Sequence, residues 1–310
     1  MKTLCFALAL LFAATAAYAM PIASSARSML PAEMQQIISV DYRALKDSPT
    51  AMALKQQVLP ENLKQFETAL KGIGIDSERD VDQLTFASFR SGKQGIQVIG
   101  VAQGSFSAKS VLKKMKLKKI AGTKYGTALL YPMGSGMVMT FLDEFTLAFG
   151  TRASLESALD TRDGKRASLD SNSRMADQMS AVDGSPVWSI LDQQGTQNMM
   201  RSALGDASKV ADYEQVKKRL LASRYTMNFA NGVNFDLAVL TSDSMTAATL
   251  STLVKAGMLY KKMNASPVEK TAIDSMTVES DSSDLQLHFK TDDQKFQSLL
   301  HSDLFAAVSH

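Results

Sequence analysis

Seven lysines lie within sixteen residues of one another and form the charged group most suited to binding a partner. They are Lys109, Lys113, Lys114, Lys116, Lys118, Lys119 and Lys124. A patch of ammonium groups attracts anionic lipid, polysaccharide or an acidic protein surface. None of the seven is Arg, which usually provides specific recognition of phosphate or carboxylate. The alternative interpretation is a solvated helix face, the ordinary state of a run of like charges.

The same stretch contains Ser110-Val111-Leu112-Lys113, which matches the S-x-x-K motif of penicillin-binding serine enzymes. Those enzymes also need Ser-Asp-Asn and Lys-Thr-Gly motifs. The nearest segments here, 242–244 (SDS) and 290–292 (KTD), differ at the third residue. We therefore interpret this stretch as a surface helix with its apolar residues facing inward, rather than as a catalytic site.

Carboxylates alternate along residues 76–82 (DSERDVD), as they do in calcium-binding loops. An EF-hand loop requires glycine at its sixth position and glutamate at its twelfth, where this chain has Val81 and Ala87. Arg79 also places a cation among the acids. The segment is more typical of solvated acids between a helix and a strand than of a calcium site.

Methionine is abundant, and Met133, Met137 and Met139 cluster along one segment, as do Met199 and Met200. Thioether clusters can bind Cu(I), but methionine also fills irregular gaps in protein cores and adaptable apolar surfaces. The alternation of these residues with others favours the inward face of a strand. An adaptable apolar binding face and a copper site remain the alternatives.

Other chemistry-bearing residues are few. The three histidines, His288, His301 and His310, have no metal-ligand spacing, and Cys5 is the single cysteine. The sequence contains no nucleophile elbow and no glycine-rich phosphate loop. We therefore expect no catalytic residue, no cofactor and no metal ligand. A carboxylate pair formed by residues distant in sequence would escape this reasoning.

The first nineteen residues have the pattern of a cleavable secretory signal peptide. Lys2 precedes an apolar run that is too short to span a bilayer, and Ala17-Tyr18-Ala19 provides small residues for cleavage. Cleavage after Ala19 would make Met20 the first residue and would remove Cys5. We therefore expect a periplasmic or extracellular protein. Its mature chain should contain no cysteine and no transmembrane segment.

Charge and export together argue against a nucleic-acid partner. The chain has 34 basic and 31 acidic residues, and loss of Lys2 with the leader would leave 33 basic residues. This near balance is unlike the strong basic excess of nucleic-acid-binding proteins. The partner is instead expected to be an envelope component or protein that the sequence does not identify, and the oligomeric state is not predicted.

Turns and alternating apolar residues predict an order of elements that is repeated once along the chain. In the first half the predicted strands are 36–42, 83–89, 96–102, 128–131, 137–142 and 145–149, and the helices are 50–58, 61–71, 108–115 and 154–159. In the second half the strands are 187–191, 225–229, 235–240, 275–279 and 285–290, and the helices are 196–204, 210–222, 244–263 and 292–300.

These elements predict the α+β class, with two similar halves, each an antiparallel sheet with helices packed on one face. Strands joined by short turns pair antiparallel, and alternating polar residues indicate a sheet with one wet face. The expected organisation is a signal peptide at 1–19, a first α+β domain at 20–160, a linker and entry helix at 161–185, and a second α+β domain at 186–310. The similar order of the halves favours an internal duplication.

The first half also resembles a loose group of exported bacterial proteins of unknown function. The resemblance rests on Leu30-Pro31-Ala32, on residues 39–45 (SVDYRAL), on residues 74–82 and on Gly150-Thr151-Arg152 before a helix. It implies an exported α+β protein and no known activity.

The sequence thus favours an exported, non-enzymatic binding or interaction module of the cell envelope. Two alternatives remain open: a carrier of an apolar small molecule, which would need a sizeable apolar cavity, and a hydrolase with an acid pair assembled by the fold.

Overall fold

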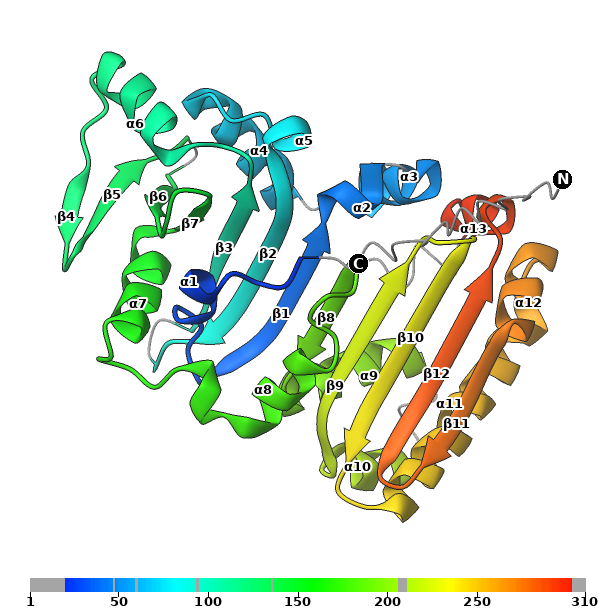
Figure 1. Cartoon of the computed structure of the whole chain (residues 1–310). Helices are drawn as coiled ribbons and strands as arrows, with labels where there is room; N and C mark the ends of the chain where they lie inside the picture. The colour runs from blue at the N-terminus through cyan, green and yellow to red at the C-terminus, as the bar shows by residue number, and fades with distance from the viewer. Residues whose placement is uncertain are drawn as a thin grey trace, which may run out of the picture.

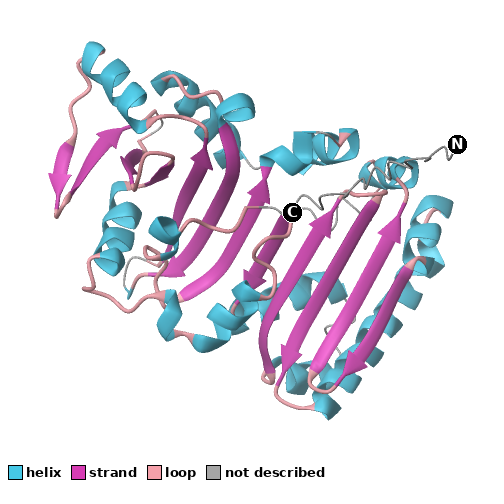
Figure 2. Cartoon of the chain, viewed as in Figure 1, coloured by secondary structure: helices cyan, strands magenta, loops and turns pink. Residues whose placement is uncertain are grey.

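A computed structural model describes residues 20–46, 48–58, 61–92, 95–134, 136–205 and 211–302. The predicted leader, Cys5 and His310 lie outside these residues. Within them, twelve strands form one antiparallel sheet in the order β11-β12-β10-β9-β8-β1-β2-β3-β7-β6-β5-β4 (Figure 1). Helices pack against the sheet and leave the C-terminal strands open on one face (Figure 2). The predicted α+β class is therefore confirmed.

The strands are β1 (Met34–Asp41), β2 (Val81–Arg90), β3 (Ile96–Gly104), β4 (Thr123–Tyr125), β5 (Ala128–Pro132), β6 (Val138–Phe141), β7 (Thr146–Gly150), β8 (Val187–Leu191), β9 (Leu220–Asn228), β10 (Val233–Thr241), β11 (Met276–Asp281) and β12 (Asp284–Thr291). The helices are α1 (Ser24–Arg27), α2 (Tyr42–Lys46), α3 (Pro49–Val58), α4 (Glu61–Ile73), α5 (Ser77–Asp80), α6 (Ala108–Leu117), α7 (Arg152–Arg162), α8 (Ser173–Ser180), α9 (Gln193–Leu204), α10 (Ala211–Lys217), α11 (Ser244–Asn264), α12 (Pro267–Asp274) and α13 (Asp293–Leu300). None of these described helices combines the length and apolar character needed to cross a membrane.

A single strand pair joins the two halves of the sheet. β1 pairs antiparallel with β8, with Ile37 opposite Ile190 and Val40 opposite Val187. From this pair outward, the strand order is β1-β2-β3-β7-β6 in one direction and β8-β9-β10-β12-β11 in the other, so the two orders correspond strand by strand. The halves thus share one sheet instead of forming two sheets, and the internal duplication stays a prediction.

In the N-terminal half, helices cover both faces of the sheet, whereas one face was expected. The face that carries Ile37 and Ala87, here named the front face, packs against α1, α7 and α8. The opposite back face, which carries Leu84 and Ala102, packs against α4 and α6. Burial on both faces explains why residues 99–102 of β3 (IGVA) are apolar and consecutively buried.

In the C-terminal half, the expected arrangement of one covered and one wet face is present. The back face of β10, β11 and β12 packs against α9, α10 and α11 through residues such as Val239, Leu250 and Leu285. The front face carries alternating polar side chains, including Asp236 and His288, which are about half exposed. Figure 1 shows these strands uncovered toward the viewer, because the helices lie behind them.

Candidate partner surface

Helix α6 presents most of the seven lysines because its apolar residues face the core. Ser107 caps its first turn by accepting a hydrogen bond from the Ser110 amide at 3.5 Å, as the sequence predicts. Val111 and Met115 are 3% and 1% exposed and pack with α4 on the back face. These two residues are one helical turn apart, so the lysines between and after them face solvent.

Two of the seven lysines have a structural role. Lys114 Nζ donates to the carbonyl oxygen of Gly74 at 3.3 Å, and Lys118 Nζ donates to that of Gly72 at 2.8 Å. Both carbonyls lie at or just beyond the end of α4, where helix carbonyls lack intrahelical partners and the helix dipole is negative. These contacts hold α6 against α4, although both lysines remain exposed.

The other lysines project outward. Lys109 is 88% exposed, and its Nζ lies 3.9 Å from a carboxylate oxygen of Glu144. The remaining four are exposed, and no polar side-chain partner is present for them among the described residues. We name these four the outer lysines: Lys113, Lys116, Lys119 and Lys124. Leu117 lies between them in sequence and is 77% exposed.

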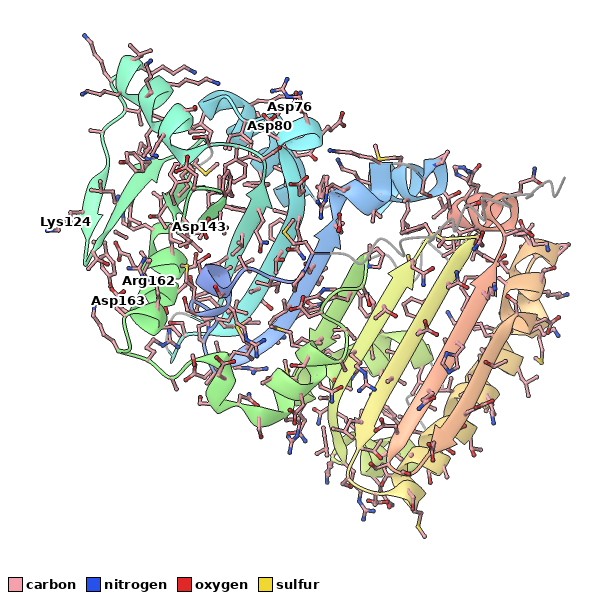
Figure 3. The ribbon with its side chains drawn as sticks, in the orientation of Figure 1. Asp76, Asp80, Lys124, Asp143, Arg162 and Asp163 are labelled. Atoms are coloured by element: carbon pink, nitrogen blue, oxygen red, sulfur yellow. The ribbon has the colours of Figure 1, made fainter. Side chains whose placement is uncertain are left out.

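Lys124 reaches the same end of the molecule from a different element. It lies on β4, which pairs with β5 and forms one edge of the sheet. Figure 3 shows Lys124 on this edge strand, at the left of the view and below α6. Lysine on an edge strand also discourages pairing with another chain, so Lys124 has a structural explanation beside the functional one.

The remaining sequence candidates have structural explanations. Asp76 caps α5 by accepting the amides of Glu78 and Arg79, and Arg79 Nε contacts Asp80 Oδ1 at 2.7 Å (Figure 3). This hydrogen bond lowers the pKa of Asp80 despite partial burial. In the described part of the chain, no three acidic, histidine or cysteine side chains are grouped to hold a metal ion. Ser110 and Lys113 of the S-x-x-K motif are both exposed.

The methionine clusters belong to the core. Met139 and Met200 are 0% and 2% exposed, and Met133 is 7% exposed. The prediction that methionine packs inside the fold is confirmed for these residues. Trp188 is likewise fully buried in the front-face core.

Sequence reasoning missed one polar pair on the open front face. His288 Nδ1 and Asp236 Oδ1 are 2.6 Å apart, because the two residues lie directly opposite each other on β12 and β10. The two strands are neighbours in the sheet but are separated by α11, α12 and β11 in the chain. The alternation of polar and apolar residues predicts His288 on the wet face. No pattern in the sequence predicts that β12 pairs with β10.

Two described pockets bear on the alternative functions. One, of about 220 Å³, lies between α12, α13 and β12 and is lined by Val268, Ala272, Phe289 and Leu299 among others. The other, of about 280 Å³, is polar and includes Glu67, Asp76 and Glu78. Small-molecule sites usually measure about 300–1,000 Å³, and both pockets lie below that range.

The fold and this surface define an α+β protein built on one continuous antiparallel sheet, with a cationic end. No family model matches the chain, and no curated protein matches it. Solved structures of TP0453 are similar in fold. Its crystal form I has 10% sequence identity and a TM-score of 0.50 over 92% of this chain and 99% of that chain. Its crystal form III has 7% identity and a TM-score of 0.51 over 88% and 96%. At these identities the similarity concerns the fold alone.

Proposed function

We propose that this protein is an exported, non-enzymatic binding protein and that the outer lysines contact an acidic partner in the cell envelope. The leader-like residues 1–19 support export. The observation that supports the binding surface is the exposure of four lysines, on α6, just after it and on β4, together with the exposed Leu117.

The local charge favours an acidic partner. Residues 105–142 contain no Asp or Glu, so the segment that carries α6 and β4 has no internal acid to neutralise its lysines. Glu144, which follows this segment, lies 3.9 Å from Lys109 Nζ. Exposed charges of one sign increase the encounter rate with an oppositely charged surface, and the exposed leucine adds apolar contact area.

The alternatives have weaker support. A carrier of an apolar molecule would need a larger cavity than the 220 Å³ pocket. For a hydrolase, the polar pocket offers Glu67, Asp76 and Glu78, but Glu67 already pairs with Lys55 at 2.9 Å and Asp76 caps α5. A hydrolase would instead need acids free to contact a substrate.

Affinity capture from the native envelope tests the proposal. The outer lysines are changed together to glutamine, and a matched variant changes four exposed lysines elsewhere: Lys218, Lys255, Lys270 and Lys290. Exposed ion pairs contribute about 0.5 kcal/mol each, so four contribute about 2 kcal/mol, or roughly thirtyfold in affinity.

We expect partners to be lost from the outer-lysine variant, retained by the matched variant, and released from the parent by added salt, because salt screens exposed charges. If both variants capture the partners as well as the parent does, the outer lysines are not the binding surface. If both variants lose the partners equally, binding depends on net charge and not on these four lysines. Turnover of an envelope substrate by the purified chain would refute the non-enzymatic assignment.

A further inference from the structure

The segment that follows the predicted cleavage site is bound to the sheet by side chains. Gln83 Nε2 donates to the carbonyl oxygen of Met20 at 2.5 Å, and the Ala23 amide donates to Gln103 Oε1 at 2.7 Å. The Ile22 amide donates to Asp183 Oδ1 at 3.2 Å. Residues 20–23 thus lie across the front face without being a strand of the sheet, and their polar backbone groups are paired individually.

The residues beneath this segment form a polar cradle in an otherwise apolar face. Ser39, Gln83, Thr85 and Gln103 are at most 5% exposed and lie on the same face as Ala87. Buried polar groups are costly unless they are hydrogen-bonded. Ser39 and Thr85 pair with each other at 2.9 Å, and Gln83 Nε2 contacts Ser39 at 3.1 Å, whereas Gln83 and Gln103 also bind the backbone of residues 20–23. The cradle therefore matches a polar backbone segment that lies on it.

Asp41 lies at the end of this cradle and contacts the first described residue. It is 3% exposed, and its Oδ1 accepts the amides of Arg43 and Ala44 at 2.9 and 3.1 Å. Its other oxygen, Oδ2, lies 3.3 Å from the backbone nitrogen of Met20. One carboxylate oxygen thus caps α2, and the other faces the nitrogen that cleavage after Ala19 would set free.

The charges around Asp41 leave an uncompensated negative charge. The Arg43 guanidinium lies 3.8 Å from Asp41 Oδ2 and 3.7 Å from Asp82 Oδ1, so one cation is shared by two carboxylates. A buried carboxylate with only part of a cation is unfavourable, and one further positive charge would balance the group.

We propose that Asp41 is the binding site for the α-ammonium group of Met20, which forms when the leader is removed. This inference rests on the proposed export. Hydrolysis of the Ala19–Met20 peptide bond by an envelope peptidase consumes one water molecule and leaves a carboxylate on Ala19 and an amine on Met20. The amine takes up a proton at neutral pH, since the pKa of an α-amino group is about 8.

Cleavage changes both the charge and the hydrogen-bonding capacity at this nitrogen. The precursor has a neutral amide with one N–H, whereas the mature chain has a cation with three. An acceptor is present in the same cradle: Gln83 Oε1 is buried and has no hydrogen-bond partner among the described residues. The ammonium group thus balances the negative charge of Asp41, and it has N–H donors for Gln83 Oε1 that the precursor amide lacks.

The functional consequence is a coupling between export and stability. Before cleavage, the folded chain retains the partly unbalanced Asp41, so its folded state is less favourable while the chain must still be translocated. After cleavage, the new terminus binds in the cradle and stabilises the packing of residues 20–23 on the sheet.

A thermodynamic cycle tests this coupling. Chains are released from a cleavable carrier fusion so that they begin at Met20 or at an added glycine before Met20, each with Asp41 or with Asp41→Asn. Asparagine can retain the cap of α2 through its single oxygen, but it replaces the Oδ2 that faces Met20 with an amide donor. The variant therefore removes both the charge and this acceptor, and the glycine-extended chains measure the loss of the acceptor without the charge. In chains that begin at Met20, Asp41→Asn is expected to lower the folding equilibrium constant by about tenfold or more, the range for hydrogen bonds between charged groups.

In the glycine-extended chains the same substitution is expected to have less than about a third of that effect in free-energy terms, because the amide at Met20 is neutral. Asp76→Asn, at the cap of α5, is the matched control and should have the same effect in both chain forms. An equal effect of Asp41→Asn in both forms overturns the proposal.

A second readout does not depend on unfolding. The Met20 amine of the folded mature chain should react slowly with an acylating reagent, as measured by mass spectrometry, and Asp41→Asn should accelerate the reaction. N-terminal sequencing of the exported chain separates the two hypotheses. A first residue other than Met20 overturns both the cleavage and this site, whereas Met20 without coupling or protection overturns this site alone.

Discussion

Replacing Gly100 with alanine tests how closely the back face of the N-terminal half is packed. A Cβ atom at Gly100 would lie 1.8 Å from Cζ of Phe149. Carbon atoms pack at about 3.5 Å or more, so the ring would have to withdraw by roughly 1.7 Å. Phe66 stacks on Phe149 with 3.6 Å between ring centroids, and Phe86 meets it edge-on at 5.9 Å. The ring therefore has no free space behind it.

We expect Gly100→Ala to lower the free energy of unfolding by about 3 kcal/mol, the upper end of the usual cost of overpacking. Urea denaturation of the chain from Met20 onward, followed by the fluorescence of the single tryptophan, measures this loss. Gly72→Ala is the control, because nothing lies within 4 Å of its added Cβ, and alanine inside α4 should add about 0.5–1 kcal/mol. Adding Phe149→Leu should partly restore the free energy of unfolding that Gly100→Ala loses. A change below about 0.5 kcal/mol in Gly100→Ala would refute the packing argument, since that is the range of neutral surface substitutions.

Two further predictions concern the C-terminal half and the core. Hydrogen bonds from Ser242 and Thr246 lower the pKa of Asp243, the cap of α11, to about 2. Because the folded-state pKa is depressed, this carboxylate stabilises the fold at neutral pH, and its contribution is lost as the pH falls from about 4 toward 2. The urea midpoints of the parent and of Asp243→Asn should therefore converge over that pH range. A constant difference between the two midpoints would contradict the assignment. Trp188 is fully buried, so acrylamide should quench its emission only after unfolding, and efficient quenching of the native chain would exclude the packing described here.

Local patterns in the sequence predict individual elements well. The predicted strand 187–191 and the observed β8 have the same bounds, and the helix expected at 108–115 is α6, with Ser107 as its cap. Both depend on nearest-neighbour physics, alternation in one case and capping in the other. The helix expected at 210–222 is wrong at its end: α10 stops at Lys217 and β9 begins at Leu220, because Leu220 and Ala222 pack in the sheet.

Contacts between distant segments could not be predicted in this way. The sequence indicated seven equivalent lysines, but Lys114 and Lys118 contact carbonyls 40 and 46 residues away. No local signal indicates that α4 ends beneath α6. The polar cradle did leave a signal: Gln83 and Thr85 occupy the same alternating positions as Ala87 and Phe89, so two polar residues lie on an apolar face. Thr85 pairs with Ser39 inside the sheet, and Gln83 binds the segment that covers this face.

The β1–β8 pair also determines how the molecule would behave if it were cut. Each half would then expose a central strand as an open edge, with Ile37 and Val40 on one fragment and Val187 and Ile190 on the other. Such apolar edges favour aggregation, and natural proteins normally protect them. The same edges are complementary in register, so the two fragments should reassemble when mixed while each alone precipitates. The β1–β8 pair is thus the position at which we expect two separate fragments of the chain to bind each other and restore the whole sheet.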